Sequence, residues 1–249
     1  STQLVGRHPR KLLALGNPVL APVVAAPQAT VPAPAGGDCG SGGIVPSALL
    51  RSLASLPDTA REIADVARAL GGDRDDVLLG PKATEAAFRD RPLADYRVVY
   101  FATHGLLPSE LRCQSQPGVV LTPPNETPQS RSLDGLLDAS EIASLSIPAE
   151  LVVLSACNTA ASGKANGGES LSGLAASFFQ AGARSLVVSH WQVPSAATTA
   201  LMSGMFSIMG ASKDMPVDAA LRAAQARLYN NAAYAHPFFW AAFRSEERR

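Results

Sequence analysis

Two predicted strands each lead into a side chain that could take part in nucleophilic catalysis. The apolar run 98–101 is followed by His104, and the apolar run 151–154 is followed by Cys157. A cysteine thiolate is a strong nucleophile, and imidazole is the side chain best suited to move protons near neutral pH. If the two strands are parallel neighbours, His104 and Cys157 emerge side by side at one edge of the sheet.

A glycine directly after the histidine adds a second feature of such a site. Gly105 lets the backbone approach a substrate carbonyl closely. Its N–H group and that of Cys157 could together form an oxyanion hole. A lone cysteine after a strand is more often a small packed residue, so the pairing with His104 carries the catalytic interpretation.

The elements that must position these residues alternate along the chain. Four short apolar runs are typical of strands buried on both faces: 12–15, 98–101, 151–154 and 186–188. Helices are indicated by a capping box over Thr59 to Glu62 with an apolar face behind it, and by apolar spacing over 171–179, 201–209 and 217–228. This alternation predicts an α/β fold with a mostly parallel central sheet covered by helices on both faces.

The length of 249 residues fits one large domain or two small ones, and we expect a single domain over residues 1–249. Residues 18–46 are rich in Pro, Ala and Gly, which predicts a long loop inside that domain. Residues 117–132 predict a second loop, and residues 244–249 a charged tail.

Composition excludes several classes of function. Lys and Arg number 21 and balance 21 Asp and Glu, so charge gives no drive toward nucleic acid or an anionic membrane. No apolar run reaches the roughly 18 residues of a membrane span, and no signal peptide opens the chain. Cys39, Cys113 and Cys157 are few and odd in number, which favours a reducing cytoplasm over a disulfide framework. Zinc-site spacing, P-loop, GxGxxG and GxSxG patterns are missing, so we expect no metal and no cofactor.

Four stretches of the chain closely resemble CHAT domains: ATHG, LSACNT, GGESLSGLAASFFQAGARSLVVSHW and HPFFWAAF. CHAT domains are caspase-like cysteine peptidases of the clan that also holds caspases, separases, legumains and gingipains. The resemblance runs over about residues 12–243, and the 53 residues from His104 to Cys157 are close to the roughly 50 expected in caspases. It implies a caspase–haemoglobinase-like three-layer α/β/α sandwich, a His104–Cys157 dyad, and oxyanion donors from the backbones of Gly105 and Cys157.

The same resemblance implies a cysteine endopeptidase that makes limited regulatory cuts in a protein or peptide substrate. It places such an enzyme in a bacterial signalling, defence or cell-death system, behind an upstream helical-repeat module, another sensor module or a partner chain. Two alternatives stay open. One is a catalytically silent caspase-like adaptor that binds partners, and the other is an acyl transferase or another thiol hydrolase.

In relatives, the strand after the nucleophile and its exit line the pocket for the residue before the cut. The matching candidates here are Ser189, His190, Trp191 and Ser195, with Glu169 and Asp134 as possible charged residues from other loops. Many relatives carry an acid where this chain has Ser195. A buried arginine without a carboxylate partner would suffer a desolvation cost of several kcal/mol. We therefore expect an uncharged residue to be preferred over Arg or Lys before the cut, unless Glu169 or Asp134 supplies the charge.

Limited self-digestion should cut within residues 18–46 or 117–132, because both stretches are rich in helix and strand breakers. Mass spectrometry of the fragments maps the cuts, and the Cys157→Ala protein is the control that should stay intact. Cuts confined to the two termini, or an active preparation without any cut, would contradict this expectation.

Overall fold

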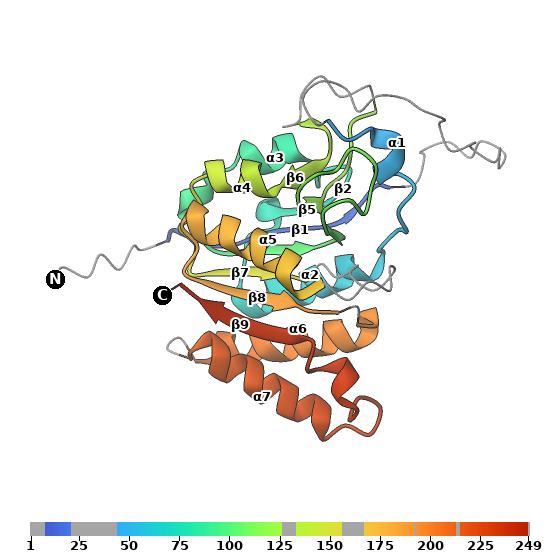
Figure 1. Ribbon diagram of the computed structural model, residues 1–249. Coiled ribbons are helices and arrows are strands. Elements are labelled where there is room, and N and C mark those ends of the chain that lie inside the picture. The colour runs from blue at the N-terminus through green and yellow to red at the C-terminus, as the bar shows by residue number, and fades with distance from the viewer. Residues whose placement is uncertain are drawn as a thin grey trace.

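The computed structural model describes residues 8–20, 44–125, 133–155, 167–191, 193–212 and 215–248, the stretch 167–172 by its backbone alone. A six-stranded sheet with the order β2-β1-β3-β7-β8-β9 forms its centre (Figure 1). The strands are β1 (Arg10–Pro18), β2 (Val77–Gly80), β3 (Tyr96–Ala102), β7 (Leu151–Leu154), β8 (Ser185–Ser189) and β9 (Phe243–Glu247). All neighbours are parallel except β8 and β9, so the predicted mostly parallel α/β fold is confirmed.

Helices cover both faces of this sheet, which gives three layers (Figure 1). One face carries α2 (Asp58–Leu70), α6 (Ser195–Ala211) and α7 (Val217–Tyr229), and the other carries α3 (Glu85–Arg89), α4 (Ala139–Ser144) and α5 (Gly167–Ala181). Side chains of one strand alternate between the two cores: Leu12 and Ala14 face α2, while Leu13 and Leu15 face the opposite helices. Burial on both faces explains why the strands read as continuous apolar runs.

A small antiparallel sheet follows His104 and is built from β4 (Gly105–Leu106), β5 (Gly118–Val120) and β6 (Leu136–Asp138). The helix α1 (Ser47–Leu50) packs against it through a separate apolar cluster that includes Leu50, Leu106 and Val120. The loop predicted over 117–132 is therefore wrong for β5, whose backbone pairs with strands on both sides. Short 3₁₀ helices, η1 (Arg74–Asp76), η2 (Leu93–Asp95) and η4 (Pro237–Phe239), complete the connections.

Three other expectations are corrected by the structure. The charged tail is instead β9, which runs antiparallel to β8 from Ser189↔Phe243 to Ser185↔Glu247, and its charged residues suit the exposed edge of a sheet. The capping box is absent from α2: its N-cap is Pro57, and Glu62 is buried on the face that also buries Ile63. Cys113 is disulfide-bonded. An odd number of cysteines shows only that they cannot all be paired in disulfides within one chain. With Cys113 bonded, the cysteine count no longer supports a reducing compartment.

Of the long loop predicted over 18–46, the structure describes only 18–20 and 44–46. No helix among the described residues is long and apolar enough to cross a membrane.

A buried carboxyl cluster joins α3 to the small sheet. Glu85 is buried and accepts a hydrogen bond from the backbone N–H of Gly135 at 2.7 Å. Arg89 is 3.5 Å from Glu85 and 3.1 Å from Glu141, so one guanidinium serves two acids. Burial raises the pKa of Glu85 to about 8, with a further contribution from the neighbouring carboxylates of Glu141 and Asp134.

The free energy of unfolding should therefore fall as pH rises from about 4.5 toward about 8, because the folded state binds the extra proton on Glu85 over that range. At about 1.4 kcal/mol per pKa unit, a rise from 4.5 to about 8 corresponds to a fall of roughly 5 kcal/mol. Denaturant titrations at several pH values should show a shallower dependence for Glu85→Gln, which mimics the protonated acid. Asp218→Asn on α7 controls for the loss of one carboxylate, and an unchanged slope in Glu85→Gln would contradict the assignment.

Candidate active site

The pairing of β3 with β7 determines where the two predicted catalytic residues fall. The register is parallel from Val98↔Leu151 to Phe101↔Leu154. In the sequence, His104 and Cys157 are each the third residue after the last paired position of their strand. The prediction that these strands are parallel neighbours is confirmed, while Cys157 itself lies outside the described residues.

His104 is buried and held in one orientation. The residue is 7% exposed, and its Nε2 lies 2.7 Å from the backbone oxygen of Ala54. A carbonyl oxygen can only accept, so Nε2 carries the hydrogen and donates it. In the neutral ring, Nδ1 is then the free base. Burial lowers the pKa of His104, and the bond to Ala54 opposes this shift only in part, which favours the neutral ring.

The backbone after His104 is arranged by the small sheet. Val120 donates its N–H to the oxygen of His104 at 2.9 Å, and the next pair in the ladder is Gly105↔Val119. In an antiparallel ladder, hydrogen-bonded and non-hydrogen-bonded pairs alternate, so Gly105 and Val119 form a non-hydrogen-bonded pair. The N–H of Gly105 is therefore directed away from β5, as an oxyanion donor would require.

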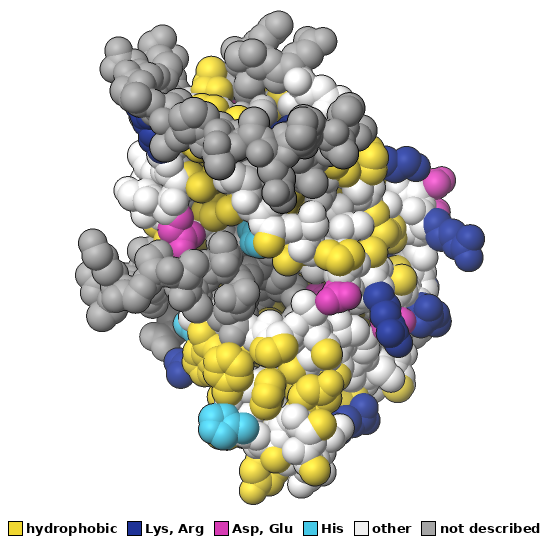
Figure 2. All heavy atoms as spheres, turned by 90° about the vertical axis from the view of Figure 1, so that its right-hand side faces the viewer, with side chains coloured by type: hydrophobic (Ala, Val, Ile, Leu, Met, Phe, Trp, Pro, Cys, Tyr) yellow, Lys and Arg dark blue, Asp and Glu magenta, His cyan; other side chains and the backbone are white. Residues whose placement is uncertain are grey.

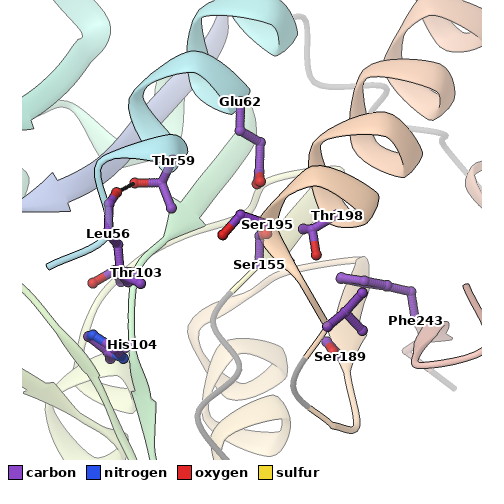
Figure 3. A pocket seen from close by; sticks show the side chains of 11 residues that line it. Leu56, Thr59, Glu62, Thr103, His104, Ser155, Ser189, Ser195, Thr198 and Phe243 are labelled. Carbon is purple, nitrogen blue, oxygen red and sulfur yellow. Dashed lines mark hydrogen bonds between the residues drawn. The ribbon is translucent and has the colours of Figure 1, made fainter. Parts of the chain in front are cut away.

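A cavity of about 80 Å³ opens beside His104 at the carboxyl ends of the parallel strands (Figure 3). Ligand pockets for cofactors and drug-sized molecules span roughly 300–1,000 Å³, so this one suits a single side chain. Hydroxyl groups make up much of its described wall, and Phe243 contributes an aromatic ring. The described lining residues are Leu56, Thr59, Glu62, Thr103, His104, Ser155, Ser189, Val193, Ser195, Thr198 and Phe243.

Glu62 contributes the carboxyl group of this cavity. It extends from α2 toward Ser155 and Ser195, on the far side of the cavity from His104 (Figure 3). The residue is 2% exposed, and its Oε1 accepts a hydrogen bond from the hydroxyl of Tyr100 at 2.6 Å. Burial raises the pKa of Glu62, while hydrogen bonds from Tyr100 and Ser155 act in the opposite direction.

The predicted substrate-binding residues separate into two groups. Ser189 and Ser195 line the cavity with His104. Trp191 instead donates its ring N–H to the oxygen of Phe238 at 3.0 Å and packs with the α6 and α7 core. His190 donates its backbone N–H to Ala242 at 2.9 Å, and burial lowers the pKa of its ring.

The two acids predicted to bind substrate, Asp134 and Glu169, are not among the described residues that line the cavity. Asp134 lies apart from the cavity, because its carboxylate accepts backbone hydrogen bonds from Val45 and Leu136, both at 2.8 Å. It lines a separate small hollow with Gln114. Glu169 lies in α5, but its side chain is outside the described residues. Within the described part of the chain, no cluster of three or more His, Cys, Asp or Glu residues is placed to hold a metal ion.

Figure 2 looks onto the side of the molecule that the parallel strands reach with their carboxyl ends. On its described surface, Lys and Arg side chains lie toward the rim, and hydrophobic side chains gather in the lower part, over the C-terminal helices. The described cations are thus scattered here and form no basic patch, in keeping with the balanced charge of the sequence.

The family model of the CHAT domain matches residues 5–245 of the chain. The chain belongs to the CHAT family. The resemblance stated from the four sequence stretches is thereby confirmed, and with it a caspase-like domain. No curated protein matches this CHAT domain.

Four contributors to the site of this CHAT domain were not predicted from the sequence. The oxygen of Ala54 orients His104, but a backbone carbonyl leaves no mark in the sequence. Ser155 and Thr198 reach the cavity from elements that were predicted without assigning them a role. Glu62 did carry a signal, since it falls on the same helical face as Ile63 and Val66, where an acid is unusual.

The pKa of His104 should lie below the ordinary histidine value of about 6.5, because burial disfavours the imidazolium. A two-dimensional NMR titration of the ring nitrogens checks this, with His104→Gln used to assign the resonances. The neutral form should be the Nε2–H tautomer throughout, as the bond to Ala54 requires. A raised pKa, or a neutral ring protonated on Nδ1, would contradict the geometry.

Proposed function

We propose that this CHAT domain is a cysteine endopeptidase that makes limited, regulatory cuts in protein substrates through His104 and Cys157. The observation that supports the proposal is the parallel register of β3 and β7, because His104 and Cys157 each follow the last paired residue of these neighbouring strands by three positions in the sequence. The fixed orientation of His104 supports it, since the bond to Ala54 leaves Nδ1 as the free base.

The first half of the reaction follows from these roles. His104 Nδ1 takes the proton of the Cys157 thiol, and the thiolate sulfur attacks the carbonyl carbon of the scissile peptide bond. The carbonyl oxygen becomes an oxyanion that the N–H groups of Gly105 and Cys157 stabilise. The orientation of the Gly105 N–H away from β5 supports its part in this step.

Collapse of the tetrahedral intermediate then breaks the C–N bond. The leaving amine departs with the proton held by His104, and the carboxyl half of the substrate stays bound to Cys157 as a thioester. Water, deprotonated by the neutral His104, attacks this acyl-enzyme and releases the acid, while the proton returns to the thiolate. A low pKa at His104 supports this cycle, because the ring must begin each half-reaction neutral.

The biological setting is proposed on the family resemblance alone. A bacterial signalling, defence or cell-death system would use such an enzyme for one or a few cuts. A helical-repeat module, another sensor module or a partner chain would supply the activating signal. The cavity beside His104, with Ser189 and Ser195 in its wall, would receive the substrate side chain before the cut.

Cys157→Ala and His104→Ala should each reduce proteolysis by at least about 10³-fold, and the double variant should be little worse than either single one, since a nucleophile and its base act as a unit. A protein substrate is first identified by mass spectrometry of the fragments that form when candidate proteins are mixed with the enzyme. The measurement is then the rate at which each variant cleaves that substrate. Ser203→Ala on α6 is a matched small-residue control. Wild-type-like cleavage by Cys157→Ala would contradict the mechanism, and wild-type protein without any turnover would favour the adaptor.

A further inference from the structure

The cavity beside His104 offers hydrogen-bond acceptors. The hydroxyl groups of Thr59, Thr103 and Ser189 donate to backbone carbonyl oxygens at 2.7, 2.6 and 2.8 Å. A hydroxyl has one proton and two lone pairs, so each of these oxygens can also accept. The Thr59 oxygen already accepts one hydrogen bond, from the backbone N–H of Asn17 at 2.8 Å, and keeps one lone pair for a guest. A guest that suits such a wall must bring donors of its own.

Glu62 adds a carboxyl group to this acceptor-rich wall. Among the described residues that line the cavity, it is the acid, and His104 is the other titratable group. The Tyr100 hydroxyl fixes Oε1 at 2.6 Å, and the carboxyl points toward Ser155 and Ser195 (Figure 3). Helix α2 therefore brings a carboxyl group to a pocket to which β8 contributes Ser189 and α6 contributes Ser195 and Thr198.

We propose that Glu62 makes this cavity selective for a basic side chain, arginine or lysine, at the substrate residue before the cut. The inference rests on the peptidase function proposed above and names the specificity of the same site. The sequence had predicted an uncharged residue before the cut, because Ser195 stands where many relatives carry an acid. Glu169 and Asp134 were the only other acids considered, since Glu62 had been assigned to a capping box. The carboxylate that the Ser195 position lacks is supplied by a different element.

The balance of charges favours a cation over other guests. An ionised Glu62 is costly in the empty, buried site, and burial accordingly raises its pKa. An ammonium or guanidinium group compensates that charge and also donates to the hydroxyl oxygens around it. An acidic side chain would meet like charge and a wall of acceptors, so the cavity excludes it. A neutral isostere such as citrulline keeps the shape of arginine but brings no charge to pair with the carboxylate.

Binding to the full Cys157→Ala chain tests this without any turnover. The probes are short peptide amides that end in Arg or citrulline, and a second pair that ends in Lys or norleucine. Dissociation constants come from calorimetry or ligand-observed NMR. We expect the basic member of at least one pair to bind about 10- to 100-fold more tightly, the range of a charge-assisted hydrogen bond.

Replacement of Glu62 should remove this preference selectively. Glu62→Gln keeps the shape and an acceptor for Tyr100, and should bind both members of a pair equally, while Glu62→Asp should retain part of the preference. Glu85→Gln, another buried acid outside the cavity, is the matched control and should keep the full preference. Equal binding of both members by the Glu62-bearing protein overturns the proposal even if Glu62→Gln fails to fold. So does a preference that survives in folded Glu62→Gln.

Parallel cleavage assays separate this inference from the peptidase proposal. If basic peptides bind through Glu62 but the chain with Cys157 intact cleaves nothing, the pocket assignment stands and the peptidase proposal fails. If the intact chain cleaves substrates with no preference for Arg or Lys, and binding shows none, the peptidase proposal stands and the role of Glu62 is refuted.

Discussion

The structure depends on the parallel pairing of β3 with β7 at the centre of the sheet. Each strand is buried on both faces, and the register from Val98↔Leu151 to Phe101↔Leu154 is held by two separate apolar cores. A slip of one residue would move every side chain to the opposite face, so packing specifies this register strongly. The packing of the core thus also fixes where the chain leaves β3 toward His104 and where it leaves β7.

The small sheet that continues from β3 arranges the backbone around His104. Pairing of His104 and Gly105 with β5 directs one backbone N–H away from the ladder. On the other side of His104, the segment that leads into α2 supplies the Ala54 oxygen to Nε2. The imidazole is therefore held by groups from two regions distant in the sequence. Burial lowers its pKa, which favours the neutral ring, and the carbonyl selects which nitrogen carries the hydrogen. These are properties that a proton-transferring histidine needs.

Much of the fold could be predicted because its signals are local. Strands buried on both faces read as apolar runs, and long amphipathic helices such as α2 and α7 show their period. The errors arose where tertiary contacts decide. β9 looked like a charged tail because an edge strand tolerates charge, and β5 looked like a loop because prolines flank it. Glu62 matched a capping box in sequence, but the packing of α2 on the sheet turns it inward. No local pattern could show that Tyr100, Ser155 and the start of α6 meet it there.

The central claim is that Cys157 is a nucleophile activated by His104. Intact-mass spectrometry after incubation with a peptide acyloxymethyl ketone, followed by peptide mapping, tests it most directly, because such a reagent alkylates a thiolate held beside a bound peptide. We expect one adduct on Cys157, which a peptide aldehyde blocks and which forms at least about 100-fold more slowly in His104→Ala. Labelling of Cys157 at the same rate without His104, or no labelling of Cys157 in protein that cleaves its substrate, would contradict it.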